Sequence, residues 1–212
     1  MTIIIDGTTG VPVSPVTGTL AVANGGTGVT TSTGSGANVL GTSPSISGAV
    51  MTTMASSVIT SGTAVASTSG TSIDFTSIPS WVKRVTVMFN GVSTSGTSNY
   101  QLQVGSGSVT TSGYNSASSY IPNGSGITVS VTSGLLIVST TAASVSVWGQ
   151  AIISLLGSNT WTYSCAVGRS DGTSYVSSGA TPALAGALDR VRITTVNGTD
   201  TFDAGSINIL YE

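Results

Sequence analysis

The chain has 212 residues, only 6% of them charged, and a formal net charge of −2. Five basic residues stand against seven acidic ones, so no basic patch can neutralise several phosphates, and we expect no nucleic-acid partner. Because the chain contains no histidine, a Ser-His-Asp triad, a Cys-His pair and any His-bearing zinc site are excluded.

The N-terminus, MTIIIDGTTG, has no basic region and only three consecutive isoleucines, which argues against a secretory signal. No stretch of the sequence approaches the ~20 apolar residues that a membrane helix needs, so we expect no membrane insertion. Ser and Thr make up roughly a third of the chain, and we expect their hydroxyl groups, rather than charges, to keep the protein surface hydrated.

Residues 1–70 differ in chemistry from the rest of the chain. Between Asp6 and Asp74 lie 67 residues without a charge, and every aromatic residue follows, starting at Phe75. A segment without large side chains cannot bury enough apolar area to offset its ordering entropy by itself. We therefore expect an extended segment that packs in an oligomer, the alternative being a free linker. Residues 49–57 could form a short helix, although their Thr content weakens it.

The glycines of NGGTG and TGSGAN, within residues 24–36, fit that interpretation. Thin chains wound around one another bring backbones close together, and only glycine tolerates such an approach. Residues 24–48 would then pack against their own copies or against a larger assembly.

From residue 71 onward the sequence shows the two-residue period of half-buried strands. We expect about eight strands, separated by polar clusters such as GVSTSGTSN and GRSDGTSYVSSGAT, at residues 84–89, 100–104, 127–131, 135–138, 145–155, 161–167, 191–196 and 207–211. This spacing is typical of an antiparallel β-sandwich or jelly roll. Cys165 falls within an apolar alternation, which predicts a small core residue rather than a reactive thiol.

The polar loops offer the candidate binding residues. Tyr114, Tyr120 and Tyr175 stand among Ser, Gly and Asn, as in surfaces that make adaptable contacts with sugars or proteins. The alternative is that the three rings cover strand ends or subunit seams. Trp81, Trp148 and Trp161 could likewise fill the core or seal a seam.

We expect no catalytic residue, no cofactor and no metal. Asp200 and Asp203 in NGTDTFDAG could serve as the acid and base of a glycosidase, but Asp and Asn beside Gly more often cap turns. Asp171 in SDGT is expected to be a turn residue for the same reason. The glycine-rich stretches lack the spacing of a phosphate-binding loop.

The string LAVANGGTGVTTSTGSGANVLGTSPSISG, residues 20–48, resembles the N-G-G-T-G-x-T-T-x-T-G segment of tail fibre and other tail-associated proteins of tailed bacteriophages. Residues 71–105 and 191–212 also resemble C-terminal domains of phage tail proteins. The resemblance implies a virion structural protein, usually a homotrimer with a slender stalk and a β-rich distal domain that contacts the host surface. It supplies no catalytic residues.

The sequence therefore predicts an all-β protein that forms an intertwined homotrimer, with a virion-attachment or stalk segment (1–70) and an antiparallel, jelly-roll-like β-sandwich (71–212). The predicted function is a short tail fibre or tail tip protein, assembled in the bacterial cytoplasm and present in the virion, that binds other tail proteins through residues 1–70 and a host-surface glycan or protein through the sandwich. The alternatives are a head or baseplate decoration with a structural role only, and a depolymerase.

Overall fold

The computed structural model of the chain describes residues 59–121, 125–139, 142–143 and 145–212. They belong to a compact unit that begins at Ala55 and ends at Glu212. The expected short helix at residues 49–57 and most of the expected extended segment lie outside the described residues.

Every regular element in the described ranges is a strand, and every pairing between strands is antiparallel. The prediction of an all-β fold with antiparallel sheets is confirmed. The strands are β1 (Thr60–Ser61), β2 (Val65–Ala66), β3 (Ser72–Thr76), β4 (Arg84–Thr94), β5 (Tyr100–Ser106), β6 (Ser108–Val109), β7 (Asn115–Tyr120), β8 (Ile127–Val131), β9 (Leu135–Val138), β10 (Val147–Gly157), β11 (Thr160–Arg169), β12 (Ser174–Ala180), β13 (Arg190–Thr195) and β14 (Phe202–Tyr211).

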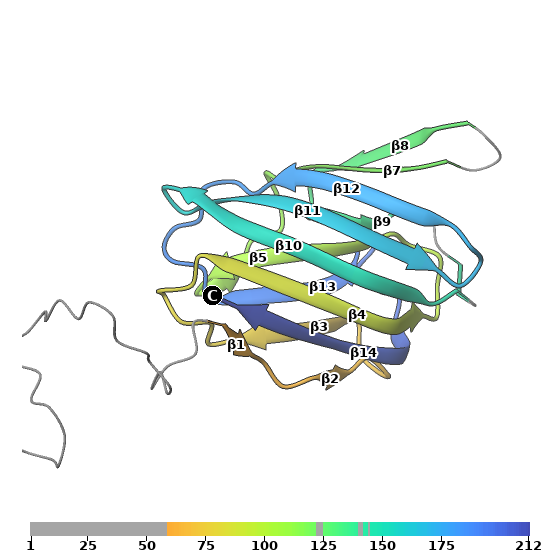
Figure 1. Cartoon of the computed structure of the whole chain (residues 1–212), viewed down its shortest axis with the longest axis horizontal. Helices are drawn as coiled ribbons and strands as arrows, with labels where there is room; N and C mark the ends of the chain where they lie inside the picture. Colours follow the sequence, from red (N-terminus) through yellow and green to blue (C-terminus); the bar gives the residue numbers. More distant parts are fainter. Residues whose placement is uncertain (1–58, 122–124, 140–141, 144) are drawn as a thin grey trace, which may run out of the picture. The chain divides into compact units, whose positions relative to one another are not determined.

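The strands form two sheets (Figure 1). The nine-stranded sheet has the order β1-β14-β4-β10-β11-β12-β7-β8, and β2 also pairs with β14. The five-stranded sheet has the order β3-β13-β5-β6, with β9 paired to β5. One hydrophobic core draws buried side chains from both sheets, so the sheets face each other across it.

Alternation along each strand builds this core. In β4, Val85, Val87 and Phe89 are buried, while the residues between them are half-buried. In β11, Trp161 and Cys165 are buried in the same way, as their apolar spacing predicts. Each large side chain withdrawn from water stabilises the fold by about 1.5–3 kcal/mol, so this two-residue period also fixes the strand register.

Six observed strands were not expected: the two-residue strands β1, β2 and β6, and the longer β3, β7 and β12. The cluster GRSDGTSYVSSGAT contains β12, and the polar segment that follows Tyr114 contains β7, although both segments are rich in serine. Their inward serines bond to the backbone of β9: Ser116 Oγ accepts from the Leu136 amide at 2.8 Å, and Ser177 Oγ donates to the Ile137 carbonyl at 3.4 Å. The prediction of loops there is wrong: β9 provides partners for Ser116 and Ser177, while Ser118 Oγ is buried without a hydrogen-bond partner in the described structure.

The pairing of β14 with β4 is interrupted by bulges between Phe202 and Ser206. Gly205 has a φ of +91°, and a Cβ placed on it would lie 2.5 Å from the backbone carbon of Gly91. Gly91 itself has a φ of +66°. Gly205 therefore lies against the Gly91 backbone, where the strands approach too closely for a side chain at position 205.

The described domain begins before residue 71. Thr60 and Ser61 pair with Tyr211 and Leu210, and β2 pairs with a more central part of β14. Ser67 is buried, and its hydroxyl donates to the Ala204 carbonyl at 2.8 Å. The chain therefore enters this domain along β14, beside its C-terminus.

Candidate binding hollow

Tyr114 does not lie exposed in a loop. It precedes β7, and only 2% of its surface is accessible. Its hydroxyl accepts from the Val104 amide at 2.8 Å and donates to the Thr110 carbonyl at 2.9 Å. Burial raises the pKa of Tyr114 to about 12, despite the opposing backbone hydrogen bond with Val104. The expectation of an exposed Tyr114 is wrong: the ring packs in the core, and its hydroxyl bridges backbone groups.

Tyr175 is also buried, with 1% of its surface accessible, because it points inward from β12. Its hydroxyl accepts from Arg169 Nη1 at 2.8 Å, and the guanidinium carbon lies 5.7 Å from the ring centroid. Tyr175 therefore cannot serve as an exposed contact residue. It anchors Arg169, the last residue of β11, at the turn that leads into β12.

The same arginine fixes Asp171 in that turn. Arg169 Nη2 lies 2.6 Å from Asp171 Oδ2, and the Thr173 amide donates to Oδ1 at 3.2 Å. Partial desolvation raises the pKa of Asp171, but the Thr173 amide and the Arg169 guanidinium outweigh it, so the net pKa lies below its ordinary value. Asp171 is thus an ionised turn residue with a fixed carboxylate, and the prediction that it lies in a turn is confirmed.

Tyr120 is the one predicted tyrosine that borders open space. It ends β7, is half-buried, and packs on Tyr175 with ring centroids 4.8 Å apart and planes tilted by 32°. Packing on a buried ring restricts the orientations open to Tyr120.

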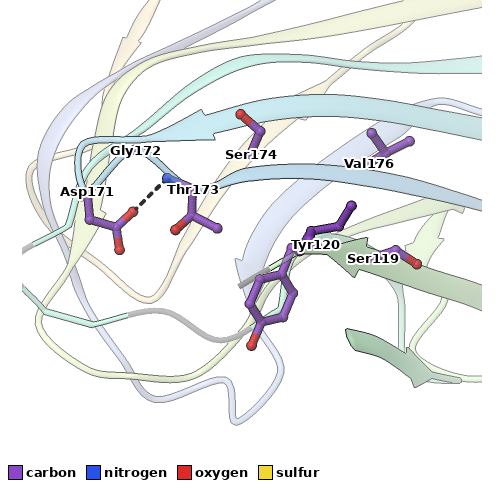
Figure 2. A pocket seen from close by; sticks show the side chains of 8 residues that line it. Ser119, Tyr120, Asp171, Gly172, Thr173, Ser174 and Val176 are labelled. Carbon is purple, nitrogen blue, oxygen red and sulfur yellow. Dashed lines mark hydrogen bonds between the residues drawn. The ribbon is translucent and has the colours of Figure 1, made fainter. Parts of the chain in front are cut away.

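Tyr120 lines a hollow of about 770 Å³ between the end of β7 and the β11–β12 turn (Figure 2). Figure 2 shows its ring on one side of this space and Asp171 and Thr173 on the other. The lining comprises Ser119, Tyr120, Ile121, Asp171, Gly172, Thr173, Ser174 and Val176. We call this space the Tyr120 hollow.

The sequence identified two members of this lining, Tyr120 as a binding candidate and Asp171 as a turn residue. It did not identify the others; for Ser174 and Val176 the reason is that their polar neighbours predict a loop, whereas both residues lie in β12. Two of the missed residues are apolar and strongly exposed: Ile121 at 73% and Val176 at 66%. The available signal was the alternation Ser174-Tyr175-Val176, which places the valine on the face opposite the buried tyrosine.

The other acidic candidates form no such site. Asp200 accepts from the Ser98 amide at 2.9 Å and from Asn197 Nδ2 at 2.7 Å, which is the turn role that the sequence favoured. Asp203 accepts from the Ser93 hydroxyl. Across the described ranges, no group of three or more His, Cys, Asp or Glu side chains could hold a metal ion.

The three tryptophans have different environments. Trp161 is 2% accessible and belongs to the core, which settles its position. Trp81 and Trp148 are 49% and 42% accessible, and Trp81 lies against Tyr211 with ring centroids 5.9 Å apart. Two of the three indoles are therefore on the surface of the domain.

In the part of the chain that the structure describes, no helix is long and apolar enough to cross a membrane. No protein-family model, curated protein or solved structure matches this chain.

Proposed function

We propose that this chain is a structural protein of the tail of a bacteriophage virion, a short fibre or tail tip piece, whose β-domain attaches the particle to a host surface. The chain would assemble in the bacterial cytoplasm and join other tail proteins through residues 1–70. The resemblance of residues 20–48 to tail-associated proteins motivates the proposal, and one structural observation carries its mechanism.

That observation is the placement of the Tyr120 hollow relative to the point where the chain enters the domain. The chain enters at β1, at one edge of the nine-stranded sheet, and the hollow lies on β12 and β7, near the other edge. Four strands separate β1 from β12, which corresponds to about 24 Å at the usual spacing of 4.8 Å. A domain tethered through β1 would therefore hold the hollow away from its tether, where a receptor can reach it.

The outer face of the same sheet supports self-association. Two cross-strand rows on the β14, β4, β10 and β11 part of this face contain Asn208, Met88, Gln150 and Ala166, and Leu210, Thr86, Ile152 and Ser164. Neither row holds a charge, so another copy could cover this part of the face, beside the hollow, without leaving an ion buried and unpaired. We propose a homotrimer of jelly-roll-like sandwiches, in which three copies multiply a weak contact at each hollow.

Immunogold electron microscopy of the phage particles tests this function. Antibody raised against residues 71–212 should place gold at the far end of the tail or of its fibres. Purified full-length protein should also compete with the particles for adsorption to host cells. Gold on the head or along the tail body, without such competition, would overturn attachment and favour a decoration role. Particles that bind no antibody would overturn the assignment to a virion.

A further inference from the structure

The Tyr120 hollow combines an aromatic ring, apolar side chains and hydroxyls in one open space. Tyr120, Ile121 and Val176 supply its apolar surface, and Ser119, Thr173 and Ser174 supply hydroxyl groups. The volume of about 770 Å³ falls within the range of about 300–1,000 Å³ that is usual for small-molecule sites. Such a lining suits a ligand that has both an apolar face and many hydroxyl groups.

Asp171 adds a fixed acceptor to this lining. Each of its carboxylate oxygens already accepts one hydrogen bond, from Arg169 or from the Thr173 amide. A carboxylate offers about four lone-pair sites, so each oxygen can still accept from a ligand hydroxyl. Since the carboxylate is already oriented, a ligand would not have to order it, which reduces the entropic cost of binding.

The charges around the hollow disfavour an anionic ligand. Asp171 is the charged residue in the described lining, and it would repel an anion. The neighbouring cation, Arg169, is engaged by both Asp171 and the Tyr175 hydroxyl, and its side chain is only 9% accessible. Phosphorylated and acidic ligands therefore lack the free cation that they need.

The backbone of the hollow disfavours an extended peptide. β12 is paired with β11 on one side and with β7 on the other, and β7 is paired with β12 and β8. Neither strand that lines the hollow offers a free edge on which a peptide could form a further strand. Side-chain hydroxyls, one carboxylate and an aromatic ring therefore carry the recognition.

We propose that the Tyr120 hollow binds an uncharged saccharide, with the C–H face of a sugar ring against Tyr120 and Val176 and with sugar hydroxyls donating to Asp171. Hydroxyl groups both donate and accept, so they can also pair with Thr173 and Ser174. This inference deepens the proposed attachment function and rests on it for its biological setting, because it names the ligand class of the same site.

The test applies labelled full-length protein to an array of neutral and acidic oligosaccharides. We expect the protein to bind neutral oligosaccharides of the array. Y120A and D171N should each lower the affinity about tenfold, the scale expected for one aromatic contact or one charge-assisted hydrogen bond. The control W148A removes an exposed ring outside the hollow and should leave the affinity within about twofold.

A second variant guards against loss of folding in Y120A. Val176 is 66% accessible, so V176R should fold normally while its side chain fills the hollow, and it should also abolish binding. The saccharide assignment is overturned if no array member binds or if acidic members bind more tightly than neutral ones. If neutral members bind but Y120A, D171N and V176R all bind them normally, the placement of the ligand in this hollow is overturned. If full-length protein competes for adsorption in any of these cases, attachment stands and the error lies in the ligand class or in its site.

Discussion

The hydroxyl of Tyr114 provides a measurable test of how the polar interior is stabilised. Tyr114→Phe keeps the ring but removes the group that accepts from the Val104 amide and donates to the Thr110 carbonyl. Because the side chain is 2% accessible, water cannot replace the lost oxygen without opening the core. A buried donor left without its partner costs about 1–3 kcal/mol, so we expect the free energy of unfolding to fall by about 2 kcal/mol.

Urea denaturation followed by tryptophan fluorescence would measure this loss. A change of 2 kcal/mol corresponds to about 4–8 °C in Tm for a domain of this size. Tyr120→Phe is the matched control, because it removes a tyrosine hydroxyl at the rim of the hollow and should change stability by less than about 0.5 kcal/mol. Equal stabilities of wild type and Y114F, with the Val104 amide equally protected from hydrogen exchange, would refute the reasoning.

Three further predictions concern the core and the bulges. Burial raises the pKa values of Tyr114 and Cys165 to about 12, from 10.0 and 9.0, so both groups stabilise the fold in their neutral forms. Their contribution to the free energy of unfolding should be fully present below about pH 9 and should be lost as the pH rises toward 12. The loss should be less steep in Y114F. A free energy of unfolding that stays constant over this range in urea titrations would contradict the prediction. The Cys165 thiol should resist a thiol reagent at pH 8 until urea unfolds the chain, and rapid labelling of the native protein would show that it is accessible. Gly205→Ala should lower the free energy of unfolding by more than about 2 kcal/mol, because the new Cβ would meet the Gly91 backbone. Gly172→Ala has a similar φ but open space around the Cβ, so it should lower that free energy by about 1 kcal/mol. Equal losses for the two variants in thermal unfolding would contradict the steric argument.

Most of the strands predicted from the sequence have apolar inward positions, but this signal does not suffice, because β3, with buried Ile73 and Phe75, was not predicted. All eight expected segments overlap observed strands, from Arg84–Thr94 to Phe202–Tyr211. The sequence did not predict β7 and β12 because their inward positions include Ser116, Ser118 and Ser177. Alternation of hydropathy cannot distinguish a buried serine from an exposed one. Burial of the Ser116 and Ser177 hydroxyls is supported by hydrogen bonds to β9 of the other sheet, which a single segment does not encode.

The same limit explains the partial success at the site. Tyr120 was identified by its polar neighbours, but the same kind of neighbours also suggested Tyr114 and Tyr175, which are buried just before β7 and within β12. The hollow itself depends on β7 and β12 being adjacent, a pairing between residues 115–120 and 174–180. Local composition carries little information about a contact across that separation.

The pairing of Thr60 with Tyr211 places the first and last strands of the domain beside each other. Neighbouring strands lie about 5 Å apart, so a linker of a few residues could join the two ends and allow new termini to be opened elsewhere by circular permutation. For the same reason the domain could be inserted as a unit into a surface loop of another protein with little distortion of that protein. We therefore expect the domain to keep both sheets when it is grafted between two points of another protein that lie a strand spacing apart.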